Sequence, residues 1–232
     1  MLFISYGMQK SASSFAFQLA KDIANTKNSQ WQLNQRLPEE LRSIFIPNNF
    51  ADNLKKLGEY IKDDEIYVVK THCPLNYKVK EMIKEGHAKA SVSIRNPYDI
   101  VVSLKDTGDR ERAKEAGQQR KYFTEIKNYT DAVKLLPPIM KNASSWLDNK
   151  DLGVLVIPFT QISQNPLEVA QDIAKLMNVD TDVTELVESY TSNKQSILEF
   201  NVGQAGRGEK LLDLSEDNEI TEDMDEFIKM YL

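Results

Sequence analysis

The chain has 232 residues, of which 28% are charged and 41% are hydrophobic, with a formal net charge of −6. These are ordinary proportions for a globular protein, and the length suits one domain with a substantial core, which we expect to cover residues 1–232. The acidic balance argues against a nucleic-acid-binding surface, because such a surface needs a basic stripe that releases counterions.

Cysteine and histidine are scarce. Cys73 is the only cysteine, which excludes an internal disulfide and fits a reducing compartment. With only His72 and His87 beside it, a metal cluster is improbable, and we predict no metal site. No apolar stretch approaches the roughly 20 residues of a membrane span, and the first apolar run lacks the basic segment of a signal peptide. We therefore expect a cytoplasmic protein.

Short apolar runs alternate with helical spacings along the chain. The runs predict buried strands at residues 2–4, 66–70, 90–94 and 154–157. The spacings predict helices at residues 15–26, 54–61, 78–84, 97–104, 122–136, 166–177 and 182–190, one that ends at Trp146, and a closing helix around residues 221–231. Strands that alternate with helices predict a three-layer α/β sandwich around a central parallel sheet of about four to five strands.

Proline, asparagine and glycine set the expected boundaries. Asn96-Pro97 and Asn165-Pro166 each join a capping asparagine to a proline, which is typical of a helix start. Pro137-Pro138 is expected to end the helix before it. Residues 28–49 are expected to hold loops and one short helix, and the glycines of residues 201–208 predict a loop.

The first fifteen residues combine a strand, a loop and a helix start. The loop contains Gly7 and Lys10, and Ser11, Ser13 and Ser14 stand just before the helical spacing begins. Such an arrangement offers backbone N–H groups, hydroxyls and a helix dipole to a phosphate-like group. The simpler interpretation is that the serines only cap the helix.

A nucleoside triphosphatase loop matches this segment poorly. The motif G-x-x-x-x-G-K-[ST] needs a glycine before its lysine, and Gln9 precedes Lys10 here. No predicted strand ends in the acidic residue that would help to hold magnesium. The loop therefore predicts a site for a phosphate-like group without a metal.

Two more polar segments follow predicted strands. Thr71-His72-Cys73-Pro74 follows the second strand and Arg95-Asn96-Pro97 follows the third. In open α/β sheets the ligand lies beyond the carboxyl ends of the strands. We therefore expect residues 7–15, 70–74 and 95–103 to form one site.

Four segments, spread over most of the chain, resemble motifs of the cytosolic-type sulfotransferases that use 3′-phosphoadenosine 5′-phosphosulfate (PAPS). Gln9 to Phe15 resembles the family's 5′-phosphosulfate loop P-K-S-G-T-T-W, and Lys70 to Pro74 resembles K-T-H-x-P. Arg95 to Ser103 keeps nearly every position of the 3′-phosphate motif R-[DN]-P-x-D-x-x-V-S, and Tyr190 to Lys194 is similar to T-S-F-K. The resemblance implies a P-loop NTPase-like sulfotransferase fold.

The resemblance also implies a role for each matching residue. Lys10 would neutralise charge at the bridging oxygen, Lys70 would assist the transferring sulfuryl group, and His72 would be the general base for in-line attack by the acceptor. Residues implied to bind the donor and its product, 3′-phosphoadenosine 5′-phosphate (PAP), are Lys10, Ser11, Ala12, Ser13, Ser14 and Phe15 in the loop, Arg95 and Ser103 at the 3′-phosphate, Thr191 and Ser192 at the base, and Arg207 and Gly208 in the glycine-rich segment. No metal is implied.

Several of these residues have a simpler interpretation. His72 could be an ordinary hydrogen-bonded histidine, and Ser103 could be a buried helix serine. Arg95 could merely pair with Asp99 across one helical turn. The charged stretch 107–119 is interpreted as a solvated helical face or a mobile loop, with a lid over the substrate as the alternative.

The chain also departs from the family pattern. Ala12 replaces a glycine, which would tighten the loop only if the backbone there avoids positive φ. Asn193 stands where an aromatic residue contacts adenine, which implies weaker stacking. The closing motif R-K-G-x-x-G-x-W is poorly kept, with Gly203 and Gly206 at its glycines and Gly208 at its tryptophan.

The predicted function is transfer of a sulfuryl group from PAPS to a hydroxyl, or an amine, of a small-molecule or glycan acceptor. The alternative is a non-catalytic protein that binds adenosine 3′,5′-bisphosphate, although such a protein has no need of a base at His72. A P-loop kinase is a third interpretation, which a requirement for magnesium would identify. Loops that vary independently of the nucleotide site would select the acceptor, so its identity and the oligomeric state stay open.

Overall fold

The computed structural model describes residues 1–42, 45–46, 50–193, 203–212 and 218–232. Five parallel strands form one sheet in the order β2-β3-β1-β4-β5. The strands are β1 (Leu2–Gly7), β2 (Phe45–Ile46), β3 (Tyr67–Thr71), β4 (Ala88–Ile94) and β5 (Leu155–Pro158). The four strands predicted from apolar runs are confirmed. Strand β2 was not predicted, because two residues at a sheet edge are too few to leave a pattern.

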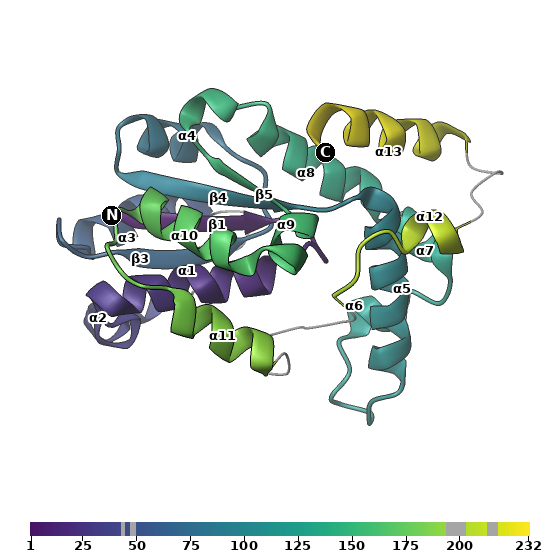
Figure 1. Ribbon diagram of the computed structural model, residues 1–232, viewed down its shortest axis with the longest axis horizontal. Helices are drawn as coiled ribbons and strands as arrows, with labels where there is room; N and C mark the ends of the chain where they lie inside the picture. Colours follow the sequence, from purple (N-terminus) through teal and green to yellow (C-terminus); the bar gives the residue numbers. More distant parts are fainter. Residues whose placement is uncertain (43–44, 47–49, 194–202, 213–217) are drawn as a thin grey trace.

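Helices connect the strands and cover both faces of the sheet (Figure 1). The α-helices are α1 (Ser13–Lys27), α2 (Gln30–Arg36), α3 (Phe50–Tyr60), α4 (Tyr77–Lys84), α5 (Pro97–Arg112), α6 (Lys121–Thr124), α7 (Tyr129–Val133), α8 (Leu136–Leu147), α9 (Phe159–Gln164), α10 (Pro166–Met177), α11 (Thr184–Ser192), α12 (Gly208–Leu211) and α13 (Asn218–Tyr231). Two 3₁₀ segments lie at Glu39–Leu41 and Lys150–Leu152. Within the described ranges, no helix combines the length and apolar character needed to cross a membrane. The predicted three-layer α/β fold is confirmed.

Side chains of the central strand alternate between two hydrophobic cores. Ile4 and Tyr6 of β1 belong to a core with α3, α4, α5, α8 and α13, whereas Phe3 belongs to a second core with α1, α10 and α11. This period of two follows from the pleat of a β-strand. Figure 1 shows α8 and α13 above the sheet and α1 and α11 below it. Because both faces are covered, the strands have the continuous apolar runs by which they were predicted.

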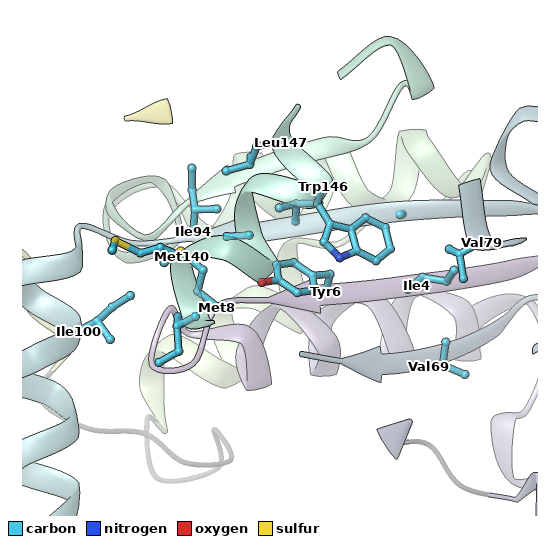
Figure 2. Packing of buried hydrophobic residues seen from close by; sticks show 14 of the residues in the cluster. Ile4, Tyr6, Met8, Val69, Val79, Ile94, Ile100, Met140, Trp146 and Leu147 are labelled. Atoms are coloured by element: carbon cyan, nitrogen blue, oxygen red, sulfur yellow. The ribbon is translucent and has the colours of Figure 1, made fainter. Parts of the chain in front are cut away.

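An aromatic pair joins β1 to α8 in the first core. The rings of Tyr6 and Trp146 stack with their centroids 5.2 Å apart and their planes inclined by 25°. Figure 2 shows the pair between Ile4 on one side and Met8 on the other. Such a pair adds about 0.5–1.5 kcal/mol beyond its area burial. The contact holds α8 beside the carboxyl end of β1, where the candidate site begins.

Several predicted helix boundaries are wrong. Residues 122–136 form two short helices, α6 and α7, and Pro137-Pro138 lies in the first turn of α8 instead of ending a helix. The first-turn amides of a helix have no intrahelical acceptor, so proline is tolerated there. Asn165 precedes α10 without a side-chain cap hydrogen bond. Asn96 does cap α5 as predicted, because its Oδ1 accepts a hydrogen bond of 2.9 Å from the Tyr98 amide.

Candidate functional site

The three predicted site segments meet at the carboxyl edge of the sheet. Strand β1 pairs with β3 so that Tyr6 lies opposite Thr71, and with β4 so that Gly7 lies opposite Ser93. One residue further, the Nδ1 atom of His72 is hydrogen-bonded to the Gly7 carbonyl oxygen. Residues that follow three strands are therefore neighbours around the end of β1.

The loop after β1 is held in a strained conformation. Lys10 and Ala12 have φ angles of 67° and 61°, in the left-handed region, which costs a non-glycine residue roughly 1–2 kcal/mol. A Cβ atom at Gly7 would lie 2.2 Å from the Cβ of Ser13 and 2.4 Å from the Oγ of Ser93. Only glycine therefore lets the start of α1 approach the strand ends so closely.

The positive φ of Ala12 decides one sequence-based expectation. Replacement of the family's glycine by alanine was expected to tighten the loop if the backbone avoided positive φ. The backbone does not avoid it, so the condition for tightening is not met and the alanine adds strain instead. The strain leaves the loop amides turned as a helix start requires, with the amide of Phe15 bonded to the Ala12 carbonyl at 2.9 Å.

The three loop serines have different surroundings. Ser11 is fully buried, and its Oγ donates to the carbonyl oxygens of Met8, at 2.8 Å, and Ser93, at 3.0 Å. Ser13 is buried at the first position of α1, while the Oγ of Ser14 accepts a hydrogen bond of 2.8 Å from the Nζ of Lys70. The cap residue of α1 is Ala12. The interpretation that the serines only cap the helix is therefore wrong.

Two lysines and an aromatic ring surround the loop. Lys70 reaches Ser14 from the end of β3, as described above. Lys10 lies with its Nζ 5.3 Å from the centre of the Phe123 ring, which belongs to α6. This cation–π contact connects the loop to the charged segment after α5. Phe123 was not among the predicted site residues, because nothing in the spacing of residues 121–124 points towards the site.

His72 has a depressed pKa. Burial lowers the pKa to about 4, and the positive charges of Lys70 and Lys10 lower it as well, against the opposing effect of the hydrogen bond to Gly7. A carbonyl oxygen only accepts hydrogen bonds, so Nδ1 carries the proton in the neutral ring. Nε2 is then the basic nitrogen. The depressed pKa favours the neutral imidazole near pH 7, and the hydrogen bond to Gly7 favours one tautomer.

Side chains of α8 hold the backbone around His72. Asn142 donates from Nδ2 to the His72 carbonyl oxygen at 3.2 Å, and Trp146 donates from Nε1 to the Cys73 carbonyl oxygen at 3.0 Å. The amide of Leu75 donates to the Oγ of Ser145 at 2.8 Å. Sequence analysis did not find these residues, because nothing in the pattern of α8 distinguishes them from other polar or core residues.

Arg95 is the most enclosed cation of the site. Only 5% of it is exposed, and its guanidinium carbon lies 3.8 Å from the centre of the Phe159 ring. Its Nη1 donates to the Lys10 carbonyl oxygen at 3.0 Å, and its Nη2 donates to that of Gln204 at 2.8 Å. Burial lowers the pKa of Arg95 to about 10, although Asp99 opposes this shift. Arg95 therefore links the loop after β1 to the glycine-rich segment.

The Arg95–Asp99 pairing considered from the sequence does exist. Nε of Arg95 lies 3.6 Å from Oδ2 of Asp99, across one turn of α5. This distance is too long for a good hydrogen bond, and among the residues that the structure describes Nε has no hydrogen-bond partner. The ion pair thus occupies one side of the guanidinium and leaves a buried donor unsatisfied.

The other predicted residues lie on α5 and in the glycine-rich segment that packs against it. Ser103 is buried two turns further along α5, as its simpler interpretation also expects. Arg207 donates from Nη1 to Oδ2 of Asp106 at 2.8 Å. Gly208 begins α12, so the predicted loop ends one residue earlier than expected. Figure 1 shows this segment beside α5.

Two of the residues predicted to contact the adenine base use their hydroxyls within their own helix. Thr191 and Ser192 are exposed at the end of α11, and their hydroxyls donate to carbonyl oxygens of the same helix, at 3.1 Å and 2.6 Å. Phe15 is buried, with its ring edge-on to Tyr190 at 5.3 Å. Asn193 is exposed. Contact of these residues with a base stays a prediction.

The charged stretch 107–119 contains a buried acid. The Glu111 side chain is only 1% exposed and accepts hydrogen bonds from the amide and Nε of Arg120, at 2.8 Å and 2.9 Å, and from the Nζ of Lys114 at 2.8 Å. The hydrogen bonds from Arg120 do most to lower the pKa of Glu111 to about 2. The interpretation of the whole stretch as solvated or mobile is therefore wrong at Glu111. A lid over the substrate stays a prediction.

The same network folds the chain back onto α5. Arg112 donates from Nη1 to the Ile126 carbonyl oxygen at 2.5 Å, and a Cβ atom at Gly108 would lie 2.2 Å from that oxygen. Residues 113–126 are thereby held against α5, with Phe123 beside Lys10.

Within the described ranges, no three His, Cys, Asp or Glu side chains are grouped as metal ligands would be.

Comparison with known proteins identifies relatives of this chain. The family model described as a sulfotransferase domain matches residues 3–228. A search of curated protein sequences finds no match. A crystal structure of retinol dehydratase in complex with androsterone and the inactive cofactor PAP is 18% identical, covers 98% of this chain and 79% of its own, and has a TM-score of 0.59.

Two further structures have the same fold. Retinol dehydratase in a complex with retinol and PAP is 17% identical, with coverage of 98% of this chain and 80% of its own and a TM-score of 0.57. A mouse sulfotransferase complexed with PAP is 14% identical, with coverage of 99% and 83% and a TM-score of 0.57.

Proposed function

The chain belongs to the sulfotransferase family, and we propose that it transfers a sulfuryl group from PAPS to a hydroxyl, or an amine, of a small-molecule or glycan acceptor, with His72 as the general base. The complexes of similar structures with PAP support this donor. The androsterone and retinol complexes support a small-molecule acceptor. We further propose that residues 1–232 act as one domain in the cytoplasm.

The residues of the site fit such a donor. Lys10, Lys70 and Arg95 come from three different segments and converge on the carboxyl edge of the sheet, where a doubly phosphorylated nucleotide needs positive charge. The guanidinium of Arg95, which lies beside the loop through its hydrogen bond to the Lys10 carbonyl oxygen, offers a buried cation to a phosphate oxygen. The start of α1 adds backbone amides and a helix dipole.

Each residue has a defined task in this proposal. The bound donor supplies the activated sulfuryl group. Lys10 and Lys70 stabilise negative charge that develops beside the loop, with Lys70 aimed by its hydrogen bond to Ser14. Arg95 and Ser103 bind the 3′-phosphate, with the guanidinium held beside the loop by its hydrogen bond to the Lys10 carbonyl oxygen. Ser11 contributes through its backbone, since its hydroxyl is used inside the protein.

The contact between Nδ1 of His72 and the Gly7 carbonyl oxygen is the observation that carries the proposed catalysis. Nδ1 is tied to Gly7, so Nε2 of the neutral imidazole is the atom that takes the proton of the acceptor hydroxyl. Lys10 and Lys70 are close enough to influence the pKa of His72 through their charges. The residues that we propose as general base and as cations for the leaving group therefore lie at one edge of the sheet.

The proposed donor is tested first by ligand-induced stabilisation in metal-free buffer. The melting temperature is measured with PAPS, with PAP, and with ATP plus magnesium. A ligand at about 100 times its dissociation constant adds roughly 2.7 kcal/mol to stability. Stabilisation by PAPS and PAP that is lost in Arg95→Ala supports the proposal. Stabilisation by ATP plus magnesium alone would point to the kinase interpretation and overturn it.

The proposed catalysis needs its own experiment. Transfer of radiolabelled sulfate from PAPS is measured against a panel of phenols, steroids, retinoids, amines and oligosaccharides. His72→Ala is expected to bind PAP as wild type does and to lose transfer by about 10²–10⁴-fold. Wild-type protein that binds PAP but transfers to no acceptor and does not hydrolyse PAPS would favour the non-catalytic alternative.

A further inference from the structure

The carboxylate of Asp99 is surrounded by backbone amides from a distant segment. Asp99 is the third residue of α5 and is 3% exposed. Its oxygens accept hydrogen bonds from the amides of Gly206, at 2.9 Å, Arg207, at 2.7 Å, and Gly208, at 2.8 Å. An acid in the first turn ordinarily serves the amides of its own helix. Here it serves amides more than 100 residues away in the sequence.

Three consecutive amides around one anion form a nest that depends on the local backbone. Gly206 has a φ angle of 72°, which glycine adopts without strain. A Cβ atom at Gly208 would lie 2.3 Å from the carbonyl carbon of Tyr98. The glycines at these two positions therefore allow the chain to turn its amides towards Asp99 and to pack directly on α5.

The same segment is held at two more points. Arg95 donates to the Gln204 carbonyl oxygen at 2.8 Å, and Arg207 pairs with Asp106 at 2.8 Å. Arg95 lies just before α5, Asp99 lies in the first turn of α5 and Asp106 lies near its middle. They hold residues 204–208, hereafter the docked segment, against it. The Gln204 contact places the docked segment directly on the guanidinium of Arg95.

We propose that Asp99 is a positioning residue of the donor site: its carboxylate docks residues 204–208 against Arg95, so that the docked segment forms the wall of the site on the side of the 3′-phosphate. The inference rests on the proposed function in one respect, the assignment of Arg95 to the 3′-phosphate. Asp99 does not touch the nucleotide. It acts by holding the segment and by keeping the Arg95 guanidinium oriented from 3.6 Å.

The proposal predicts a selective loss of affinity. A nucleotide with a 3′-phosphate should depend on Asp99, and one without it should not, because the docked segment contacts Arg95, the residue that we assign to the 3′-phosphate. A purely structural role of Asp99 would weaken both nucleotides alike. PAP and AMP differ by the 3′-phosphate alone, so the ratio of their dissociation constants is the decisive quantity.

The first experiment uses Asp99→Asn in the full chain, with Asp109→Asn as the matched control. Asp109 lies on the same helix but forms exposed ion pairs with Lys105 and Arg112. Hydrogen exchange without ligand should show amides 206–208 exchanging at least about tenfold faster in Asp99→Asn. Calorimetry should show PAP binding weakened about tenfold or more and AMP binding unchanged. Asp109→Asn should match wild type in both measurements.

A second pair of variants leaves the buried carboxylate intact. Arg207 has a φ angle of −80°, which proline adopts, so Arg207→Pro removes one amide of the nest and keeps the φ angle at that position. Arg207→Ala removes the same side chain and keeps the amide. Arg207→Pro is expected to bind PAP several-fold more weakly than Arg207→Ala, with no difference for AMP. This comparison tests the proposal even if Asp99→Asn does not fold.

The outcomes separate this inference from the proposed function. If wild type does not bind PAP, the donor assignment is wrong, and the inference falls with it. Wild type that binds PAP leaves the donor assignment intact. If Asp99→Asn, Arg207→Pro and Arg207→Ala then all keep the wild-type ratio of PAP to AMP affinity, only the role of Asp99 is overturned. Equal weakening of PAP and AMP also overturns it, because that result describes a general loss of structure.

Discussion

The Nδ1 atom of His72 donates a hydrogen bond to the carbonyl oxygen of Gly7, joining the ends of β3 and β1. Since β1 and β3 are parallel, with Tyr6 opposite Thr71, this contact continues the register of the sheet by one residue. The sheet itself thus sets which ring nitrogen of His72 is basic. The same bond places the imidazole at the start of the loop that carries Lys10.

We expect His72 to titrate far below its ordinary pKa of about 6.5. Burial and the charges of Lys70 and Lys10 lower its pKa to about 4. Histidine ring resonances measured by NMR between pH 3.5 and 8 in His87→Gln, which leaves one histidine, should give a midpoint well under 6.5. A midpoint at or above 6.5 would contradict the burial of a neutral ring beside two lysines.

The same shift makes stability depend on pH. Above about 6.5 the histidine is neutral in both folded and unfolded chains and contributes nothing. As the pH falls from about 6.5 towards 4, the unfolded chain takes up the proton more readily, so the free energy of unfolding decreases. Urea unfolding at pH 7 and pH 5 should show a larger decrease for wild type than for His72→Gln. Equal decreases would mean that His72 is not the group responsible.

Ala12→Gly should stabilise the protein. Ala12 has a φ angle of 61°, and glycine removes roughly 1–2 kcal/mol of strain while costing some entropy in the unfolded chain. We expect a net gain of up to about 1 kcal/mol in urea unfolding. Ala20→Gly, in the buried middle of α1, is the control and should destabilise by about 1 kcal/mol. A loss of stability in both variants would show that Ala12 is not strained.

Asn142→Ala should lower turnover without weakening donor binding. The side chain of Asn142 holds the backbone of His72 through its carbonyl oxygen and makes no described contact with Lys10 or Arg95. We expect a several-fold decrease in kcat with the PAP dissociation constant unchanged, because a small displacement of a general base reduces proton transfer. Lys141→Ala, exposed on the same helix, is the control. A change in PAP affinity equal to the change in kcat would argue against a specific effect on His72.

Glu111→Gln should loosen the segment that carries Phe123. The buried carboxylate binds Arg120 and Lys114, and hydrogen bonds to a charged group contribute about 1.5–3 kcal/mol in such a setting. We expect a loss of about 2 kcal/mol and faster tryptic cleavage at Lys114 and Arg120. Glu115→Gln, exposed in the same segment, should cleave at the wild-type rate.

The ionised carboxylate of Glu111 should also make the stability of the protein depend on pH, at lower pH than His72 does. Its pKa is lowered to about 2, below the ordinary glutamate value of about 4.3. The ionised Glu111 contributes fully to stability above about pH 4.3, and this contribution is lost as the pH falls towards 2. The difference in the free energy of unfolding between wild type and Glu111→Gln should therefore become smaller as the pH is lowered from about 4.3 to 2. A difference that stays constant down to pH 2 would exclude an ionised Glu111 as the cause.

Local signals in the chain determined the elements of the fold and the segments of the candidate site. Apolar runs predicted four of the five strands found in the part of the chain that the structure describes, because a strand covered on both faces must be apolar along its length. Strand ends followed by Lys10, His72 and Arg95 placed those residues at one edge, because parallel strands share the direction of their carboxyl ends. The motif around Arg95 contains Asp99, but its spacing suggests only a partner one turn away.

Only the tertiary structure decided what these residues touch. Asp99 meets amides 206–208, His72 is held by Asn142, and Lys10 lies beside Phe123, through contacts between residues roughly 70 to more than 100 positions apart in the chain. No periodicity records such contacts, because they arise from the packing of whole helices against the sheet. The positive φ of Ala12 is likewise invisible in an alanine, since the strain is imposed by the close approach of α1 to β1 at Gly7.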